Sequence, residues 1–196
     1  MLTWRKGGAL PFLFIIPDLK FTELNKAVEA FRGSKDPQAF RYVYDLLSGR
    51  LYYICLRYLK NEHDAQDILQ ETFVTVYHKI DSFGGQGSFE GWIRKITVNQ
   101  CLNKLRLDKK HFELNDRIRE QDTLIPEEAE EKHATEEHLL KALHELPVGY
   151  RTILNLAVLE DYSHKEISRL LNITESTSRS QLSRAKIALR EKLNGL

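Results

Sequence analysis

The sequence predicts an all-α protein built from two small helical domains joined by a flexible acidic linker, with a helix-turn-helix in the second domain. Apolar residues recur at helical spacing along most of the chain, and no stretch alternates with the period of two that a half-buried strand requires. The helical pattern lapses between the domains, where acidic residues gather. Since 42% of the 196 residues are hydrophobic, each domain can bury a core.

Four segments follow from this pattern. Residues 1–20 form an accessory N-terminal extension, residues 21–108 the first helical domain, residues 109–135 the linker and residues 136–196 the second helical domain. The apolar run in the extension is interrupted by Pro11 and Pro17 and is shorter than the roughly 20 residues that cross a bilayer. We therefore expect no membrane insertion and a cytoplasmic protein, which the two widely separated cysteines also favour.

Five helices are expected in the first domain. They cover residues 22–31, 37–47, 50–59, 64–80 and 89–107. Thr22 is the expected N-cap of the first helix and Ser88 that of the last, because both side chains can accept a hydrogen bond from the backbone of the next turn. Gly49 is expected to separate the second helix from the third, because glycine weakens a helix.

The helix expected over "DAQDILQETFVTVY" has one apolar and one acidic side. On its outer side lie Asp64, Asp67 and Glu71, with Gln70 at the edge and Val74 among them. Asp67 and Glu71 are like charges one turn apart, which is unfavourable in an isolated helix. An exposed valine in an acidic patch is typical of a surface that binds a basic, partly apolar protein. A simpler interpretation is that acids in a first turn interact favourably with the helix dipole.

The same three carboxylates could instead hold a magnesium ion. No other identifiable segment brings ligands towards them, and the sequence has no phosphate-binding glycine loop, nucleophile elbow or H-E-x-x-H motif. The sequence therefore predicts no enzyme, no cofactor and no metal site. A metal-dependent nucleic-acid enzyme that uses Asp64, Asp67 and Glu71 is the least favoured alternative.

Aromatic and basic residues share the helix expected over "SFEGWIRKITVNQCLNKLR". Lys95, Asn99 and Arg106 align along one side, with Asn103 beside them and Trp92 near the start. A row of cationic and amide side chains near a tryptophan suits single-stranded or melted DNA, because flipped bases stack on rings and their edges bond to amides. The alternative is a core tryptophan with solvated lysines, and for Trp92 alone that alternative is favoured.

The second domain is expected to end in a helix-turn-helix. In "SHKEISRLLNITESTSRSQLSRAK" Ser163 and Glu166 have the spacing of a capping box. Asn172 can take the left-handed conformation at a helix end, and Thr174 can cap the next helix. The second helix of such a motif enters the major groove of DNA.

That second helix is expected to have an inward and an outward side. The inward side holds Ser178, Leu182, Ala185 and Leu189. The outward side holds Ser176, Arg179, Ser180, Ser183, Arg184 and Lys186. Arginine can pair bidentately with guanine, and serine reaches base edges or phosphates, whereas a merely solvated positive face is the alternative. Ser178 is polar at an inward position, and we expect its hydroxyl to bond a carbonyl one turn earlier.

Charged residues are sorted into blocks, although the net charge is only +1. Residues 91–110 hold six basic residues against one acid, residues 113–137 hold ten acids against three basic residues, and residues 163–196 hold seven basic residues against three acids. Two positive blocks thus flank a negative one.

Three motifs together resemble the extracytoplasmic-function (ECF) group of bacterial RNA polymerase sigma factors. "DAQDILQETFVTVYHKIDSF" is similar to their polymerase-docking helix, and "SFEGWIRKITVNQCLNKLR" to the segment that melts and reads the minus-ten promoter element. "LHELPVGYRTILNLAVLEDYSHKEISRLLNITESTSRSQLSRAK" is similar to the domain that reads the minus-thirty-five element. The resemblance covers residues 25–193. It implies that residues 21–108 are sigma region 2 and residues 136–196 are sigma region 4.

The resemblance also implies partners and site residues. The partners are core RNA polymerase and promoter DNA, with an anti-sigma factor as a further candidate. The polymerase-binding residues would be Asp64, Asp67, Gln70, Glu71 and Val74. The residues at the melted minus-ten strand would be Trp92, Lys95, Asn99, Asn103 and Arg106. The residues in the major groove of the minus-thirty-five element would be Ser176, Arg179, Ser180, Ser183 and Arg184.

The sequence departs from the family pattern at three positions of the expected recognition helix. Many members carry an apolar residue at Ser178, a basic one at Gln181 and a larger one at Ser183, so the promoter sequence of a relative cannot be transferred. The first twenty residues have no counterpart in the family pattern. The main alternative function is a helix-turn-helix transcriptional regulator that does not depend on stable polymerase binding, which would leave the acidic side and the Lys95 row unexplained.

Overall fold

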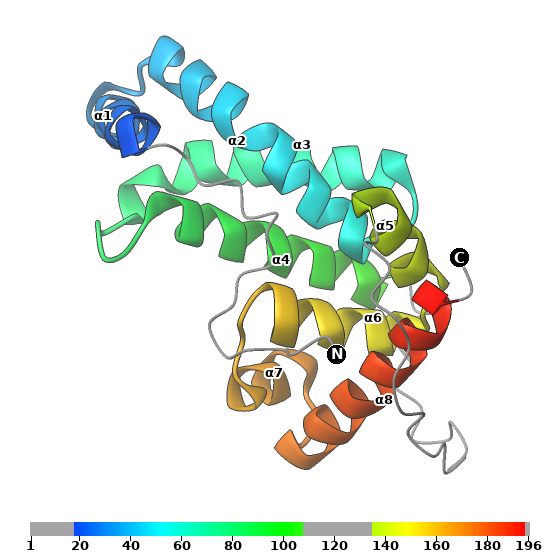
Figure 1. Cartoon of the computed structure of the whole chain (residues 1–196). Coiled ribbons are helices and arrows are strands. Elements are labelled where there is room, and N and C mark those ends of the chain that lie inside the picture. Colours follow the sequence, from blue (N-terminus) through cyan, green and yellow to red (C-terminus); the bar gives the residue numbers. More distant parts are fainter. Residues whose placement is uncertain (1–17, 108–134, 195–196) are drawn as a thin grey trace. The chain divides into compact units, whose positions relative to one another are not determined.

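The computed structural model describes residues 18–107 and 135–194, which are entirely helices and their connections (Figure 1). The all-α prediction is therefore confirmed for these ranges. The predicted N-terminal extension, apart from its last residues, and the predicted linker, apart from Thr135, lie outside them. The helices are α1 (Asp18–Ser34), α2 (Pro37–Tyr58), α3 (Glu62–Lys79), a 3₁₀ turn η1 (Ile80–Ser82), α4 (Phe89–Leu107), α5 (Glu136–Glu145), α6 (Val148–Leu154), a π-helical segment η2 (Asn155–Leu159), α7 (His164–Leu171) and α8 (Glu175–Asn194).

Two predicted helix boundaries are wrong. Gly49 does not separate two helices, because α2 runs through it without a break. A glycine inside a helix costs only about 1 kcal/mol relative to alanine, and the buried side chains of Leu47 and Leu51 on either side stabilise the continuous helix. Thr22 does not cap α1, because this helix already begins at Asp18.

The described residues group into two compact units. One contains residues 18–55 and 61–102, and the other contains residues 56–60, 103–107 and 135–194. No helix in either unit is both long and apolar enough to cross a membrane.

A cluster of aromatic rings joins α1, α2 and α3 at the edge of the first unit's core, with Phe31 and Phe73 buried, Phe40 half-buried, and Tyr44 and Tyr77 exposed. The ring of Phe31 on α1 lies 4.9 Å from that of Phe40 on α2 and 5.6 Å from that of Tyr77 on α3, measured between ring centroids. Phe73 lies 4.6 Å from Tyr44 in the same way. Interlocked rings of this kind bury large areas in fixed orientations. They hold α3 so that its opposite face is left outside.

The connection to α4 also contains aromatic packing. Phe83, Phe89 and Trp92 form a cluster with centroid separations of 5.4 to 5.7 Å. Ser88 caps α4 as predicted, since its hydroxyl oxygen accepts a hydrogen bond from the Gly91 N–H at 3.1 Å. The loop, the cap and the rings together fix where α4 begins.

The second unit has an apolar core in which α8 packs against α5 and α6. Its buried members are Ala142, Leu143, Leu146, Tyr150, Leu154, Ala185 and Leu189. In the first unit, the thiols of Cys55 in α2 and Cys101 in α4 are fully buried.

Candidate functional site

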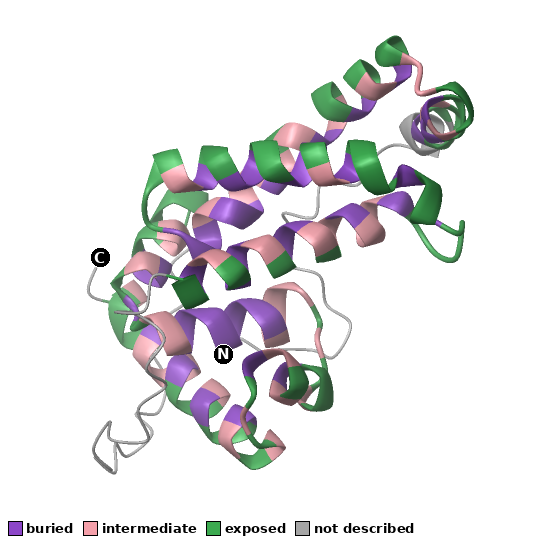
Figure 2. Cartoon of the chain, turned by 180° about the vertical axis from the view of Figure 1, so that it is seen from behind, coloured by how far each residue is buried: buried purple, intermediate pink, exposed green. Residues whose placement is uncertain are grey.

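The outer face of α3 is open to solvent in the described part of the chain. The apolar face of this helix is buried through Ile68, Phe73, Val76 and their neighbours. Asp67, Gln70 and Glu71 are exposed, Asp64 is half-buried, and Val74 leaves 57% of its surface accessible (Figure 2). The five predicted polymerase-binding residues are thus brought together on one accessible helix face, hereafter the acidic stripe. Their role as a binding surface stays a prediction.

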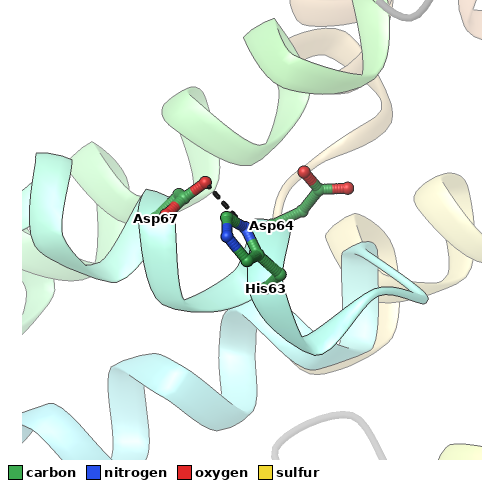
Figure 3. Close-up of side chains that lie close together, drawn as sticks. All are labelled: His63, Asp64 and Asp67. Carbon is green, nitrogen blue, oxygen red and sulfur yellow. Dashed lines mark ion pairs between the residues drawn. The ribbon is translucent and has the colours of Figure 1, made fainter.

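His63 is a member of this face that the sequence analysis did not identify. Its Nδ1 atom lies 3.1 Å from Asp67 Oδ2, one helical turn away (Figure 3). Asn61 caps the helix, because its side-chain oxygen accepts a hydrogen bond from the His63 N–H at 2.9 Å. The i, i+4 spacing of His63 and Asp67 is visible in the sequence and could have identified this histidine as part of the face.

Asp64, Asp67 and Glu71, the three carboxylates considered as magnesium ligands, do not come together as one group. The ligand atoms that come within 4.8 Å of one another belong to His63, Asp64 and Asp67, and Glu71 is not among them. All three come from the first two turns of one helix (Figure 3), and His63 and Asp67 are exposed whereas Asp64 is half-buried. The arrangement can attract a positively charged surface of a partner.

The predicted row on α4 is exposed along its length. Lys95, Asn99, Asn103 and Arg106 are all accessible, and the Arg106 guanidinium donates a hydrogen bond to Asn103 Oδ1 at 2.8 Å. Trp92 is half-buried, because its ring packs on Phe83 and Phe89. The favoured interpretation of Trp92 as a packing residue fits this environment. The row therefore offers cationic and amide groups on one helix face.

A polar bridge joins α4 to α3, and the sequence analysis missed it. The side-chain oxygen of Gln100 lies 2.5 Å from the hydroxyl of Thr72, and its Nε2 donates to the hydroxyl of Thr75 at 2.9 Å. Thr72 is fully buried, whereas Thr75 and Gln100 are half-buried. Polar residues at i and i+3 facing a glutamine on another helix leave no periodic signal in a sequence.

The helix-turn-helix has the predicted local structure. The hydroxyl of Ser163 accepts a hydrogen bond from the Glu166 N–H, and the Glu166 carboxylate accepts one from the Ser163 N–H at 2.9 Å, which completes a capping box. Asn172 takes the left-handed conformation with φ of 55°. Thr174 caps α8 by accepting a hydrogen bond from the Thr177 N–H at 3.0 Å. Asn172 and Thr174 thus end α7 and begin α8 on either side of the short turn between the two helices.

The outward side of α8 is exposed as expected. Ser176, Arg179, Ser180, Ser183 and Arg184 are accessible, and Lys186 is half-buried. The Arg179 guanidinium donates to the Glu175 carboxylate at 2.9 Å, one turn earlier on the same helix. An acid that holds an arginine in this way can orient its donor edge towards a base.

The inward side of α8 differs in two details from the prediction. Ser178, Ala185 and Leu189 are buried as expected, but Gln181 is buried and Leu182 only half-buried. The Ser178 hydroxyl does not need a carbonyl one turn earlier, because it lies 2.8 Å from Nδ1 of His164 on α7. Burial lowers the pKa of His164, and the positive charges of Arg179 and Lys186 lower it further while Glu175 opposes them.

Comparisons with known protein families match both helical parts of the chain. The model of Sigma-70 region 2 matches residues 43–111, and the model of Sigma-70 region 4 matches residues 136–189. The chain is 30% identical to the ECF RNA polymerase sigma factor SigW of Bacillus subtilis over 172 residues, which cover 82% of this chain and 92% of SigW. It is 30% identical to SigM of the same organism over 78% of this chain and 93% of SigM.

Two solved structures with a similar fold are complexes with another protein. The sigma factor RpoE of Bartonella quintana, solved in complex with the anti-sigma factor NepR, is similar with a TM-score of 0.52 and 21% identity over 79% of this chain and 96% of that chain. CnrH, solved in complex with the cytosolic domain of CnrY, is similar with a TM-score of 0.50 and 18% identity over 88% of this chain and 98% of that chain. At these identities the likeness concerns the fold.

Proposed function

Because the chain belongs to the ECF family of RNA polymerase sigma factors and directs promoter-specific transcription initiation, we propose that it divides this work among three surfaces. The acidic stripe of α3 binds core polymerase, the row on α4 binds the melted minus-ten strand, and the outward side of α8 reads the minus-thirty-five element. In this assignment residues 21–108 act as region 2 and residues 136–196 as region 4.

The single observation that carries the polymerase surface is the exposure of Val74 among carboxylates. Asp67 and Glu71 are exposed one turn apart, and Val74 is the most exposed apolar side chain of α3. Burying this valine against a partner removes apolar area from water, and the acids select a partner of positive charge. A basic helical surface of polymerase with an apolar strip meets both requirements.

The polymerase surface is tested by reversing charge on the stripe. The variant Asp67→Lys with Glu71→Lys should fold normally and fail to co-purify with core polymerase. Glu29→Lys with Glu191→Lys is a matched control, because it reverses the same number of exposed charges elsewhere. Co-purification of the stripe variant at the level of the control would reject the assignment.

The two DNA surfaces are supported by exposed positive charge on different helices. Lys95 and Arg106 on α4 flank exposed amides, which can bond to the edges of unpaired bases. Arg179 and Arg184 are exposed on α8, and in helix-turn-helix motifs the second helix is the one that enters the major groove. The free energy for melting would come from these contacts, with each stacked base contributing about 1 to 3 kcal/mol. The protein would then act without covalent chemistry, as a non-enzymatic subunit working in the cytoplasm.

An anti-sigma factor is a further proposed partner. The support is the fold similarity to RpoE of Bartonella quintana, which was solved with an anti-sigma factor bound. The alternative of a polymerase-independent regulator accounts for α7 and α8 but assigns no task to the acidic stripe. Run-off transcription with purified core polymerase on genomic fragments distinguishes them, because such a regulator would yield no new transcripts from core enzyme alone.

A further inference from the structure

The amide of Gln100 is the polar link between the helix of the proposed polymerase surface and the helix of the proposed melted-strand surface. Its oxygen lies 2.5 Å from Thr72 Oγ1, and its nitrogen donates to Thr75 Oγ1 at 2.9 Å. Thr72 Oγ1 also lies 2.8 Å from the carbonyl oxygen of Ile68. The amide therefore contacts two hydroxyls, and the single proton of the Thr72 hydroxyl is shared between the Gln100 oxygen and the Ile68 carbonyl of α3.

This geometry adds a directional restraint on the rotation of α4 relative to α3. Thr72 and Thr75 are three residues apart, so their hydroxyls lie on the same side of α3. A planar amide whose two ends are both engaged has one orientation available to it. Apolar side chains of the two helices such as Ile68 and Leu102 are buried, but their contacts have no preferred direction. Gln100 supplies the directional restraint.

The bridge residues are sequence neighbours of residues in both proposed surfaces. Asn99, which is exposed in the α4 row, immediately precedes Gln100. Glu71 and Val74, both exposed in the acidic stripe, immediately precede Thr72 and Thr75. One residue step on each helix therefore separates the hydrogen-bonded groups from groups assigned to polymerase and to DNA.

We propose that Gln100 is a positioning residue that holds the α4 row in a fixed register with the acidic stripe, so that docking of α3 on polymerase presents Asn99 to the unpaired strand. Gln100 itself contacts neither partner in this arrangement. The inference rests on the proposed function of the two surfaces and adds the group that couples them.

The test separates polymerase binding from strand binding. Gln100→Leu keeps the size of the side chain and removes both hydrogen bonds. We expect the variant's affinity for core polymerase to stay within about twofold, while its holoenzyme binds a single-stranded non-template oligonucleotide spanning the minus-ten element about tenfold more weakly, the equivalent of one lost hydrogen bond. Fluorescence anisotropy with labelled oligonucleotide measures the second quantity, and titration of labelled sigma factor with core enzyme measures the first.

Two further variants make the result specific to the bridge. Thr75→Val removes one of the two hydrogen bonds and should produce a smaller loss of strand binding. Because Thr75 is only half-buried, this variant is less prone to unfold than a change at the fully buried Thr72. Combined with Gln100→Leu it should add little, because both substitutions break the same bridge. Gln38→Leu changes an exposed glutamine of α2 in the same way and should leave both affinities unchanged.

Several outcomes would overturn the inference. Equal weakening of core and strand binding, or a loss that follows the fall in thermal stability, would make Gln100 a packing residue only. Full additivity of the Gln100→Leu and Thr75→Val effects would do the same. Asn99→Ala tests the proposed function itself. If this variant binds the strand normally, the proposed α4 surface is wrong. If Asn99→Ala weakens strand binding but Gln100→Leu does not, the surface stands and only the positioning role of Gln100 is rejected.

Discussion

His164 Nδ1 lies 2.8 Å from the hydroxyl oxygen of Ser178, so one hydrogen bond joins the two helices of the helix-turn-helix at their inner face. Ser178 is fully buried in the first turn of α8. A serine hydroxyl can donate or accept, and so the bond can form with either tautomer of the imidazole. The pair replaces apolar packing with a directional link that determines how α8 lies on α7.

The first prediction concerns this pair. Ser178→Val or His164→Phe alone leaves one buried or half-buried polar group without its partner, which should reduce the free energy of opening of α8 by about 1 to 3 kcal/mol. The double variant should recover part of that loss, because neither polar group remains. Hydrogen exchange of α8 amides in the full chain measures the opening free energy. Simple addition of the two single effects would show that the bond has no stabilising role.

The second prediction is a pH dependence. Burial lowers the pKa of His164, and burial also lowers the pKa of His144 in α5. The unfolded chain therefore binds a proton more readily than the folded chain, so stability is full above the ordinary histidine pKa of about 6.5 and is lost as the pH falls through the lowered folded values. Urea unfolding between pH 8 and about pH 5 should show this fall.

The contribution of His164 to that fall can be isolated by substitution. His164→Gln keeps a group that can bond Ser178 but does not titrate, so the decrease in stability on acidification should become smaller. The remaining slope should fall further in a variant that also carries His144→Gln. His138→Gln, at an exposed position of α5, serves as the control. An unchanged slope in His164→Gln would contradict the assignment.

The third prediction concerns the start of α7. Ser163→Ala removes the hydroxyl of the capping box and should destabilise the first turn by about 1 kcal/mol. Ser168→Ala is the matched control, since its hydroxyl bonds the Lys165 carbonyl within the same helix and alanine has the higher helix propensity there. Hydrogen exchange should therefore rise in α7 for Ser163→Ala and fall or stay constant for Ser168→Ala. Identical exchange in the two variants would argue against the cap.

The fourth prediction concerns base reading by Arg179. If its guanidinium, held by Glu175, pairs bidentately with a guanine, Arg179→Ala should cost about 1 to 3 kcal/mol at one position of the minus-thirty-five element. Arg179→Lys should lose most of the same preference, because a single ammonium cannot form the paired contact. Competition binding of the holoenzyme with single-base promoter variants measures the preference. A uniform loss on every sequence would indicate a phosphate contact instead, and Arg190→Ala, an exposed change outside the proposed surface, controls for charge.

Local signals in the sequence predicted those parts of the fold that local interactions determine. The capping box of Ser163, the left-handed Asn172 and the Thr174 cap are all determined within four residues, and each prediction is confirmed. Gly49 led to a wrong prediction of where α2 ends, because the packing of neighbouring leucines outweighs the intrinsic cost of one glycine.

Partners from distant segments could not be predicted in the same way. The sequence identified Ser178 as a polar residue at an inward position but paired it with a carbonyl of its own helix, whereas its partner is His164, fourteen residues earlier. Gln100 left no signal at all, because its two threonine partners lie on another helix. The exposed surfaces were predictable from periodicity, and the buried polar links that hold them were not.

The enclosed thiols of Cys55 and Cys101 have a practical consequence. Both side chains are completely shielded from solvent, one in each of two helices that pass through the first unit. A thiol reagent can modify them only when the surrounding packing opens, so the rate of alkylation measures how often that happens. The two natural cysteines can therefore report local opening of the native state, because mass spectrometry follows their alkylation without any engineered residue.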